Sequence, residues 1–185
     1  MIIIFWKMHN VSLNKPTINE IEIVGVVFGR NVTVTNPVNM YGCTIGDDCF
    51  VGPFVEIQNN TKIGDRTRVQ SHCFICELVT IGEDCFIGHG VMFINDSFEM
   101  GKPARGHKEL WVPTHIGDNV SIGSNATILP VSICDHVVVG AGSVVSRDIT
   151  IPGTYHGSPA RLVRPFADKS PGKYGKVNTD WPISD

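Results

Sequence analysis

The chain has 185 residues, of which 42% are hydrophobic, and this size and composition suit a single folded domain. A formal net charge of -3 and the lack of a Lys/Arg cluster argue against a nucleic-acid partner. The apolar opening Met1–Trp6 is far too short to cross a bilayer and lacks a signal-peptide cleavage site, so we expect a cytoplasmic protein with no membrane partner.

An internal repeat begins at Phe28, where an apolar residue starts to recur at every sixth position. Residues 1–27 precede the repeat and are predicted to form an N-terminal extension and lead-in. The fifth residue of each hexad is small or β-branched, as at Cys49, Val55 and Thr67. The apolar column consists of Phe28, Val34, Met40, Ile45, Val51, Ile57, Ile63, Val69, Ile75, Ile81, Ile87, Phe93, Ile116, Ile122, Ile128, Ile133, Val139, Val145 and Ile151.

These hexads predict a coil of three short strands. Residues two apart in a strand point to the same side, so the fifth residue of one hexad and the first of the next both point inward. A small residue beside a large aliphatic one fits the narrow interior of a three-sided coil. Three hexads close one coil of about eighteen residues, and successive coils stack at the strand spacing of about 4.8 Å.

The departures from the period are ordered. The hexads that begin at Met40 and Ile128 are one residue short, and the long interruption follows Phe93, so all three lie on the third face of their coils. We therefore predict an all-β fold, a parallel β-helix over residues 28–157 with six coils and the start of a seventh. One long protruding loop is expected at 99–115 and a C-terminal tail at 158–185.

Six cysteines include Cys73 and Cys76, which have the spacing of a redox or metal motif. The register favours a structural interpretation, because Cys49, Cys73 and Cys85 all take the small inward position. There a free thiol acts as a compact hydrophobic group. No cluster of Cys and His has the short spacings of a zinc site, so no metal is expected.

The first candidate site surrounds His89, which should point outward at a turn. It lies between two glycines and close to Asn95, Asp96 and the long loop, and these surroundings favour a functional role over that of a solvated side chain. Glu77 and Asn95 take equivalent positions one coil apart and should stack about one strand spacing from each other. A carboxylate beside an amide suits the binding of amine or hydroxyl groups, and an exposed polar ladder is the equal alternative.

The second candidate is the long loop, because such a loop on a regular scaffold is more often functional than decorative. Lys102, Arg105 and His107 are placed to meet a diphosphate, and Trp111 to pack on a ring. A clasp between subunits is the alternative, and the two roles are compatible.

The third candidate is the C-terminal end of the repeat. Ala141 and Gly142 leave room for a thin ligand along the coil, and Arg147, Arg161 and Arg164 offer positive charge to phosphates. Basic residues at a chain end are often only solvated, so each arginine alone is a weak signal.

Longer stretches of the chain resemble a known family. The segments IQNNTKIGDRTRVQSHCFICELVTIGEDCFIGHGVMFIND and TIGDNVSIGSNATILPVSICDHVVVGAGSVV, with the ending HGSPARLVR, resemble the hexapeptide-repeat nucleotide-sugar N-acetyltransferases of bacterial surface-glycan pathways. The resemblance is strongest to 3-N-acetyltransferases that act on dTDP-3-amino-3,6-dideoxyhexoses. Enzymes that act on a UDP-linked 3-amino glucuronate are a near second.

This resemblance implies a left-handed β-helix and a homotrimer. It also implies acetyl-CoA as co-substrate in the groove between neighbouring helices, with the nucleotide sugar entering from the loop side. The predicted acetyl-CoA contacts are Ser124, Ala141, Gly142, Arg147, Arg161 and Arg164. The predicted substrate contacts are Glu77, Asn95, Asp96, Arg105 and Trp111.

The chemistry of acetyl transfer narrows the catalytic roles. Transfer from a thioester to an amine needs a neutral amine, a stabilised oxyanion and a site for the departing proton. Because thiolate leaves readily, direct attack by the amine is expected. His89 is the candidate general base, and Asn125, one coil later on the same face, is expected to orient the amine or the carbonyl. The predicted reaction acetylates the 3-amino group of a dTDP-linked 3-amino-3,6-dideoxyhexose for O-antigen or S-layer synthesis.

Other functions fit the sequence less well. An O-acetyltransferase of the same fold would need a base more strictly, because a hydroxyl must lose its proton to attack. A γ-class carbonic anhydrase needs three zinc-binding histidines, and His72, His89, His107 and His115 lack the expected close pairing. A purely structural β-helix would carry outward Thr rows, which are absent. No nucleotidyltransferase domain precedes the repeat, which argues against a bifunctional enzyme.

Overall fold

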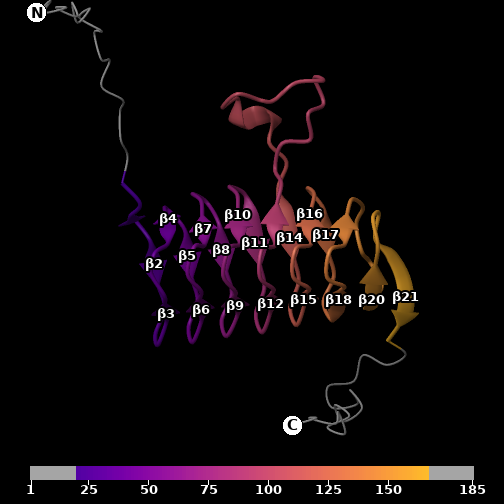
Figure 1. Ribbon diagram of the computed structural model, residues 1–185, viewed down its shortest axis with the longest axis horizontal. Helices are drawn as coiled ribbons and strands as arrows, with labels where there is room; N and C mark the ends of the chain where they lie inside the picture. The colour runs from indigo at the N-terminus through magenta and orange to yellow at the C-terminus, as the bar shows by residue number, and fades with distance from the viewer. Residues whose placement is uncertain (1–19, 167–185) are drawn as a thin grey trace, which may run out of the picture.

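The computed structural model describes residues 20–166 and shows a rod of stacked coils with one loop projecting from its side (Figure 1). Three parallel sheets form the sides of the rod. Sheet A contains β1 (Ile23–Val24), β4 (Asn39–Tyr41), β7 (Glu56–Ile57), β10 (Phe74–Ile75), β13 (Met92–Phe93), β16 (Thr127–Ile128) and β19 (Val144–Val145). Sheet B contains β2 (Val27–Phe28), β5 (Thr44–Ile45), β8 (Lys62–Ile63), β11 (Val79–Ile81), β14 (Thr114–Ile116) and β17 (Ser132–Ile133).

Sheet C contains β3 (Thr33–Val34), β6 (Phe50–Val51), β9 (Arg68–Val69), β12 (Phe86–Ile87), β15 (Ser121–Ile122), β18 (Val137–Val139), β20 (Gly153–His156) and β21 (Arg161–Pro165). The chain visits sheet B, then C, then A in each coil. Residues 20–166 thus contain the six predicted coils and the start of a seventh. The predicted parallel β-helix is confirmed, and β21, which pairs antiparallel with β20, closes its C-terminal end.

The paired strands reach slightly beyond the expected limits of 28–157. β1 lies ahead of Phe28 and pairs with β4, and β21 lies after the expected end. The long excursion leaves after β13 and returns at β14, so His115 lies within a strand of sheet B and is exposed. Both short hexads and the long loop fall at the corner between sheets A and B, the A–B corner, as the third-face prediction requires.

The interior of the rod is the predicted column of aliphatic side chains. The large inward residues from Ile45 to Val145 are buried. The small inward residues, such as Cys73, Val120 and Ala126, are buried beside them. Because the interior is filled, any ligand must bind on the outer faces, at the corners or against a neighbouring molecule.

Two members of the predicted column are exposed rather than buried. Phe28, on the first strand of sheet B, is 40% exposed. Ile151 is 52% exposed, whereas Ile149 is 4% exposed and bridges to Ile133 of sheet B. The turn after Val145 is shorter than a hexad, so Ile149 arrives at the inward position first. The turn is fixed in this register because the backbone N–H of Ser132 donates to Oδ1 of Asp148 at 2.8 Å.

Candidate active site

His89 lies at the corner between sheets C and A, the C–A corner, where each coil from the second to the sixth contributes a two-residue turn. These turns are Pro53–Phe54, Ser71–His72, His89–Gly90, Ser124–Asn125 and Ala141–Gly142. Backbone hydrogen bonds stack them: Gly90 N–H donates to the Ser71 carbonyl at 3.0 Å, and Asn125 N–H donates to the His89 carbonyl at 2.8 Å. The corner thus brings together the predicted residues His89, Ser124, Asn125, Ala141 and Gly142.

The second residue of each turn has a left-handed backbone, with φ of 69° at Gly90 and 58° at Asn125. Gly90 is required for a further reason. A Cβ atom at this position would collide with Oδ1 of Asn125, so the missing side chain leaves room for the Asn125 amide. The amide therefore lies over the turn that carries His89, one coil along the rod.

The imidazole of His89 is exposed and contacts a polar side chain of the preceding coil. Its Nδ1 atom lies 2.8 Å from Oγ of Ser71, the residue at the equivalent place 18 residues earlier. Ser71 is not among the site residues predicted from the sequence. The signal that reveals it is the spacing, because one coil of this helix takes about eighteen residues.

The long loop lies at the other edge of sheet A, beyond Ile94. Its two limbs meet in an antiparallel bridge between Asp96 and Trp111. The Asp96 carboxylate accepts the N–H groups of Phe98 at 3.0 Å and Ala104 at 2.7 Å, so both of its oxygens hold the loop backbone. The short 3-10 helix η1 (Lys108–Leu110) lies in the returning limb.

The carboxylate of Glu77 is nearly covered at the base of this loop. Lys108 Nζ donates to both of its oxygens at 2.8 Å, and the Glu77 side chain is 9% exposed. Asn95 Nδ2 donates to the Glu77 backbone carbonyl at 3.2 Å, as expected for neighbours one coil apart. Lys108 Nζ also lies 5.4 Å from the centre of the Trp111 ring. Lys108 is not among the predicted site residues, because a contact between residues 31 positions apart leaves no local pattern in the sequence.

Lys108→Met is expected to loosen the loop, because Glu77 would keep a largely buried charge without its cation. The cost should be about 1–2 kcal/mol, less than for a fully buried pair, since Lys108 is 59% exposed. Limited proteolysis within the loop should accelerate roughly tenfold. Lys102→Met, at an exposed position on the same loop, is the matched control. Equal cleavage rates in the two variants would contradict an anchoring role for Lys108.

The predicted site residues therefore form two groups within the chain. His89, Ser124, Asn125, Ala141 and Gly142 stack at the C–A corner, and Glu77, Asn95, Asp96 and Trp111 lie at the A–B corner and in its loop. Arg105 is exposed on the loop with φ of 51°. Sheet A separates the two groups.

The three arginines predicted at the C-terminal end have different surroundings. Arg147 and Arg161 line a pocket of about 190 Å³ together with Tyr155, Ala160 and Leu162. Arg164 instead lies over the Phe166 ring, with its guanidinium 5.6 Å from the ring centre. Gly142 is exposed, and a Cβ atom added to it would meet no atom within 4 Å. The end of the C–A corner is therefore smooth. Arg161 lies beside it through its pairing with His156, whereas Arg147 lies in the turn from sheet A to sheet B.

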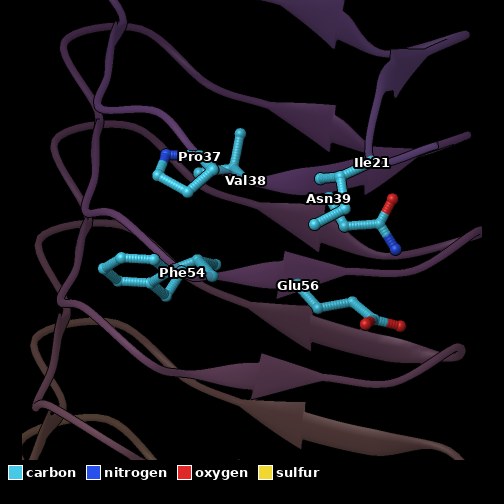
Figure 2. Close-up of a pocket in the computed structure, with 7 residues that line it drawn as sticks. Ile21, Pro37, Val38, Asn39, Phe54 and Glu56 are labelled. Atoms are coloured by element: carbon cyan, nitrogen blue, oxygen red, sulfur yellow. The ribbon is translucent and has the colours of Figure 1, made fainter.

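An apolar pocket at the N-terminal end of the C–A corner was not predicted. It has a volume of about 210 Å³ and is lined by Ile21, Pro37, Val38, Asn39, Phe54, Val55 and Glu56. Figure 2 shows Pro37, Val38 and Asn39 on one coil and Phe54 and Glu56 on another. The exposed ring of Phe54 stacks on that of His72, with centroids 4.8 Å apart. Outward residues have no period, so the sequence does not reveal this pocket.

The cysteines behave as small core residues. All six are free, and five of them are buried. Burial raises the pKa of the Cys73 thiol to about 11 and that of Cys76 to about 12, so neither is a nucleophile near neutral pH. In residues 20–166 no group of three or more His, Cys, Asp or Glu side chains is placed to hold a metal ion. No helix in this range is long and apolar enough to span a membrane.

The coils match models of a known repeat. Residues 42–77 match a model described as the bacterial transferase hexapeptide of six repeats. Residues 78–94 and 113–147 match a model described as the hexapeptide repeat of succinyl-transferase. Such repeats fit a left-handed β-helix, in agreement with the predicted hand.

Individual proteins are also similar to this chain in sequence. The bifunctional protein GlmU of Dichelobacter nodosus is 32% identical over 130 residues, which make up 65% of this chain and 28% of that protein. The chain thus spans about a third or less of the length of the curated relatives that it matches. A galactoside acetyltransferase solved with coenzyme A is 31% identical, with a TM-score of 0.57, covering 67% of this chain and 64% of that one.

A third similarity concerns the fold alone. A mutant of AntD, an N-acyltransferase from Bacillus cereus solved with dTDP and coenzyme A, aligns with a TM-score of 0.64. The two chains are 19% identical, and the alignment covers 75% of this chain and 83% of that one.

Proposed function

We propose that this protein, built from the hexapeptide repeats of bacterial transferases, is an acetyl-CoA-dependent N-acetyltransferase. The observation that carries the proposal is the C–A corner, where an exposed histidine and an amide are stacked between an apolar pocket and a smooth end with Arg161 nearby. A thioester donor and a polar acceptor need two separate binding surfaces that meet beside a proton acceptor.

We assign the binding surface for acetyl-CoA to the C-terminal half of the C–A corner. Ser124, Ala141 and Gly142 leave a path for the pantetheine chain, and Arg161, beside the end of this path, offers charge to the phosphates of CoA. Arg147, in the turn from sheet A to sheet B, shares a pocket with Arg161 and would reach the phosphates from that side. The galactoside acetyltransferase named above was solved with coenzyme A, which supports the same donor here. Arg164 is assigned a lesser role, because its guanidinium lies over Phe166.

The acceptor is proposed to be a nucleotide-linked amino sugar, most specifically a dTDP-3-amino-3,6-dideoxyhexose of a bacterial surface-glycan pathway. The dTDP bound to AntD supports this nucleotide. Arg105 and Trp111 on the loop, with Glu77, Asn95 and Asp96 at its base, would contact the sugar or its diphosphate. Since sheet A separates the loop from His89 within one chain, we propose a homotrimer in which the loop of one subunit approaches the C–A corner of the next.

The chemical step is direct attack. The neutral amine nitrogen attacks the thioester carbonyl carbon, so that a C–N bond forms and the C–S bond breaks. The amine proton passes to Nε2 of His89 and then to the departing thiolate, which leaves an amide and the free thiol of CoA. Asn125, held over Gly90, donates its amide N–H to the developing oxyanion or orients the amine.

The test is mass spectrometry of products after acetyl-CoA is offered with a panel of dTDP- and UDP-linked amino sugars and their hydroxyl counterparts. Acetylation of a dTDP-3-amino sugar supports the proposal in full, and acetylation of a UDP-linked 3-amino sugar alone would move it to the other nucleotide. A galactoside offers only hydroxyl groups, so the similarity to a galactoside acetyltransferase favours an O-acetyltransferase as the second candidate. Acetylation of hydroxyl sugars and not of amines would establish that second candidate.

Gly90→Ala is expected to lower kcat about tenfold to a hundredfold and to leave the KM for acetyl-CoA nearly unchanged. The added Cβ would displace the Asn125 amide from its place over the His89 turn. Alanine at φ of 69° also costs about 1–2 kcal/mol of stability.

Gly25→Ala is the matched control, because Gly25 has a similar φ of 61° and its added Cβ would meet nothing closer than 3.9 Å. Both variants should lose similar stability in thermal unfolding, and only Gly90→Ala should lose activity. Unchanged kcat in Gly90→Ala would remove Asn125 from the mechanism.

A further inference from the structure

The hydroxyl of Ser71 is hydrogen-bonded to the imidazole of His89, at 2.8 Å from Nδ1. The two residues are held in register by the backbone, because the Ser71 carbonyl accepts the N–H of Gly90 at 3.0 Å. Ser71 is half-buried, whereas His89 is exposed. The contact is therefore built into the stacking of two coils and does not depend on a free surface side chain.

This contact has a consequence for the proton on the imidazole. A neutral imidazole carries one N–H, and the hydrogen bond at one ring nitrogen decides which nitrogen holds it. A serine hydroxyl can accept as well as donate. If Nδ1–H donates to Oγ of Ser71, the lone pair of Nε2 is free to face an acceptor substrate. The opposite arrangement would put the hydrogen on Nε2, and the ring could no longer accept a proton there.

We infer that Ser71 is a positioning residue that holds the proton of neutral His89 on Nδ1, and that its lack of charge suits the site to amine acceptors. This inference rests on the proposed function. A carboxylate in the same place would stabilise the imidazolium, as the aspartate does in a Ser-His-Asp triad. Ser71 orients the ring and adds no negative charge.

The groups around His89 agree with this inference. The turns on either side contribute one other titratable side chain, His72, whose ring stacks on Phe54. The flanking strands contribute Arg68, whose guanidinium lies over Phe50 at 4.6 Å. In the turns and strands of the structure that directly flank His89, no carboxylate is present. An amine can attack while neutral and lose its proton late, whereas a hydroxyl needs the stronger base.

The test compares three substitutions at one position. Ser71→Ala should lower kcat about tenfold with an amino-sugar acceptor, and Ser71→Thr, which keeps the hydroxyl, should retain most of the activity. Ser71→Asp places a carboxylate beside Nδ1 and so favours the imidazolium. The acidic limb of kcat/KM against pH should then move to higher pH by about one unit. Activity toward the matched hydroxyl sugar should rise relative to the amine.

Two further measurements separate this inference from the proposed function. Long-range proton–nitrogen NMR of the wild type should show His89 protonated at Nδ1, and the double variant Ser71→Asp/His89→Ala should lose the pH shift. Protonation at Nε2, or unchanged kcat in a folded Ser71→Ala variant together with no shift in Ser71→Asp, would overturn the inference and leave the function intact. A wild type that acetylates no amine would refute the proposed function, and the NMR result would still decide the tautomer.

Discussion

His89→Ala is expected to lower kcat/KM with an amino-sugar acceptor by up to about 10²–10⁴, the range for loss of a general base. The imidazole is exposed at the C–A corner, and the substitution should not disturb the core. If positioning of the two substrates provides most of the rate, the loss will be smaller and the pH profile will keep its shape. With a hydroxyl acceptor, the same change should nearly abolish activity and remove one limb of the profile.

The measurement is kcat/KM against pH for the wild type and the variant with matched amine and hydroxyl acceptors. His115→Ala is the control, because His115 is exposed on β14 of sheet B, away from the C–A corner. It should leave kcat/KM unchanged. A complete loss of amine acetylation in His89→Ala would count against easy direct attack, since an amine should still react slowly without the base.

Gly142→Trp is expected to weaken acetyl-CoA binding by about a hundredfold or more. Gly142 is exposed, with open space where a side chain would begin, so an indole would project into the proposed path of the pantetheine chain. A hundredfold loss of affinity corresponds to about 2.7 kcal/mol of binding free energy.

Gly142→Ala is the matched control, because alanine meets the same backbone cost at φ of 67° without filling the path. Both variants should show similar thermal unfolding, and only the tryptophan variant should lose affinity in calorimetric titration with acetyl-CoA. Equal affinity in the two variants would place the donor elsewhere on the rod.

The interior of the rod could be predicted from the sequence because each inward residue touches its equivalents in neighbouring coils. The spacing alone therefore placed residues such as Val51, Ile87 and Ile122 in the core. The prediction that Ile151 points inward was wrong, because the turn at Asp148 is shorter than a hexad. A hydrogen bond from Ser132 holds this turn, and the period does not encode it.

The C–A corner was partly predictable for the same reason. His89 and Asn125 follow from the register, and Ser71 follows once the register is applied in the other direction along the rod. The pairing of Lys108 with Glu77 could not be predicted, because the path of a long loop is set by contacts outside the repeat. The apolar pocket beside Phe54 depends on outward side chains that obey no period.

The antiparallel strand β21 has a consequence for how the protein behaves in concentrated solution. A stack of parallel strands ends in unpaired N–H and C=O groups, which invite another chain to add on and can seed fibres. Along sheet C, β21 turns back and occupies that edge, with Arg161 paired to His156 and Arg164 to Thr154. Every residue of β21 is exposed, so this strand holds little of the core and serves mainly as a cover. Removing it would leave the coils intact and open sheet C to end-to-end growth.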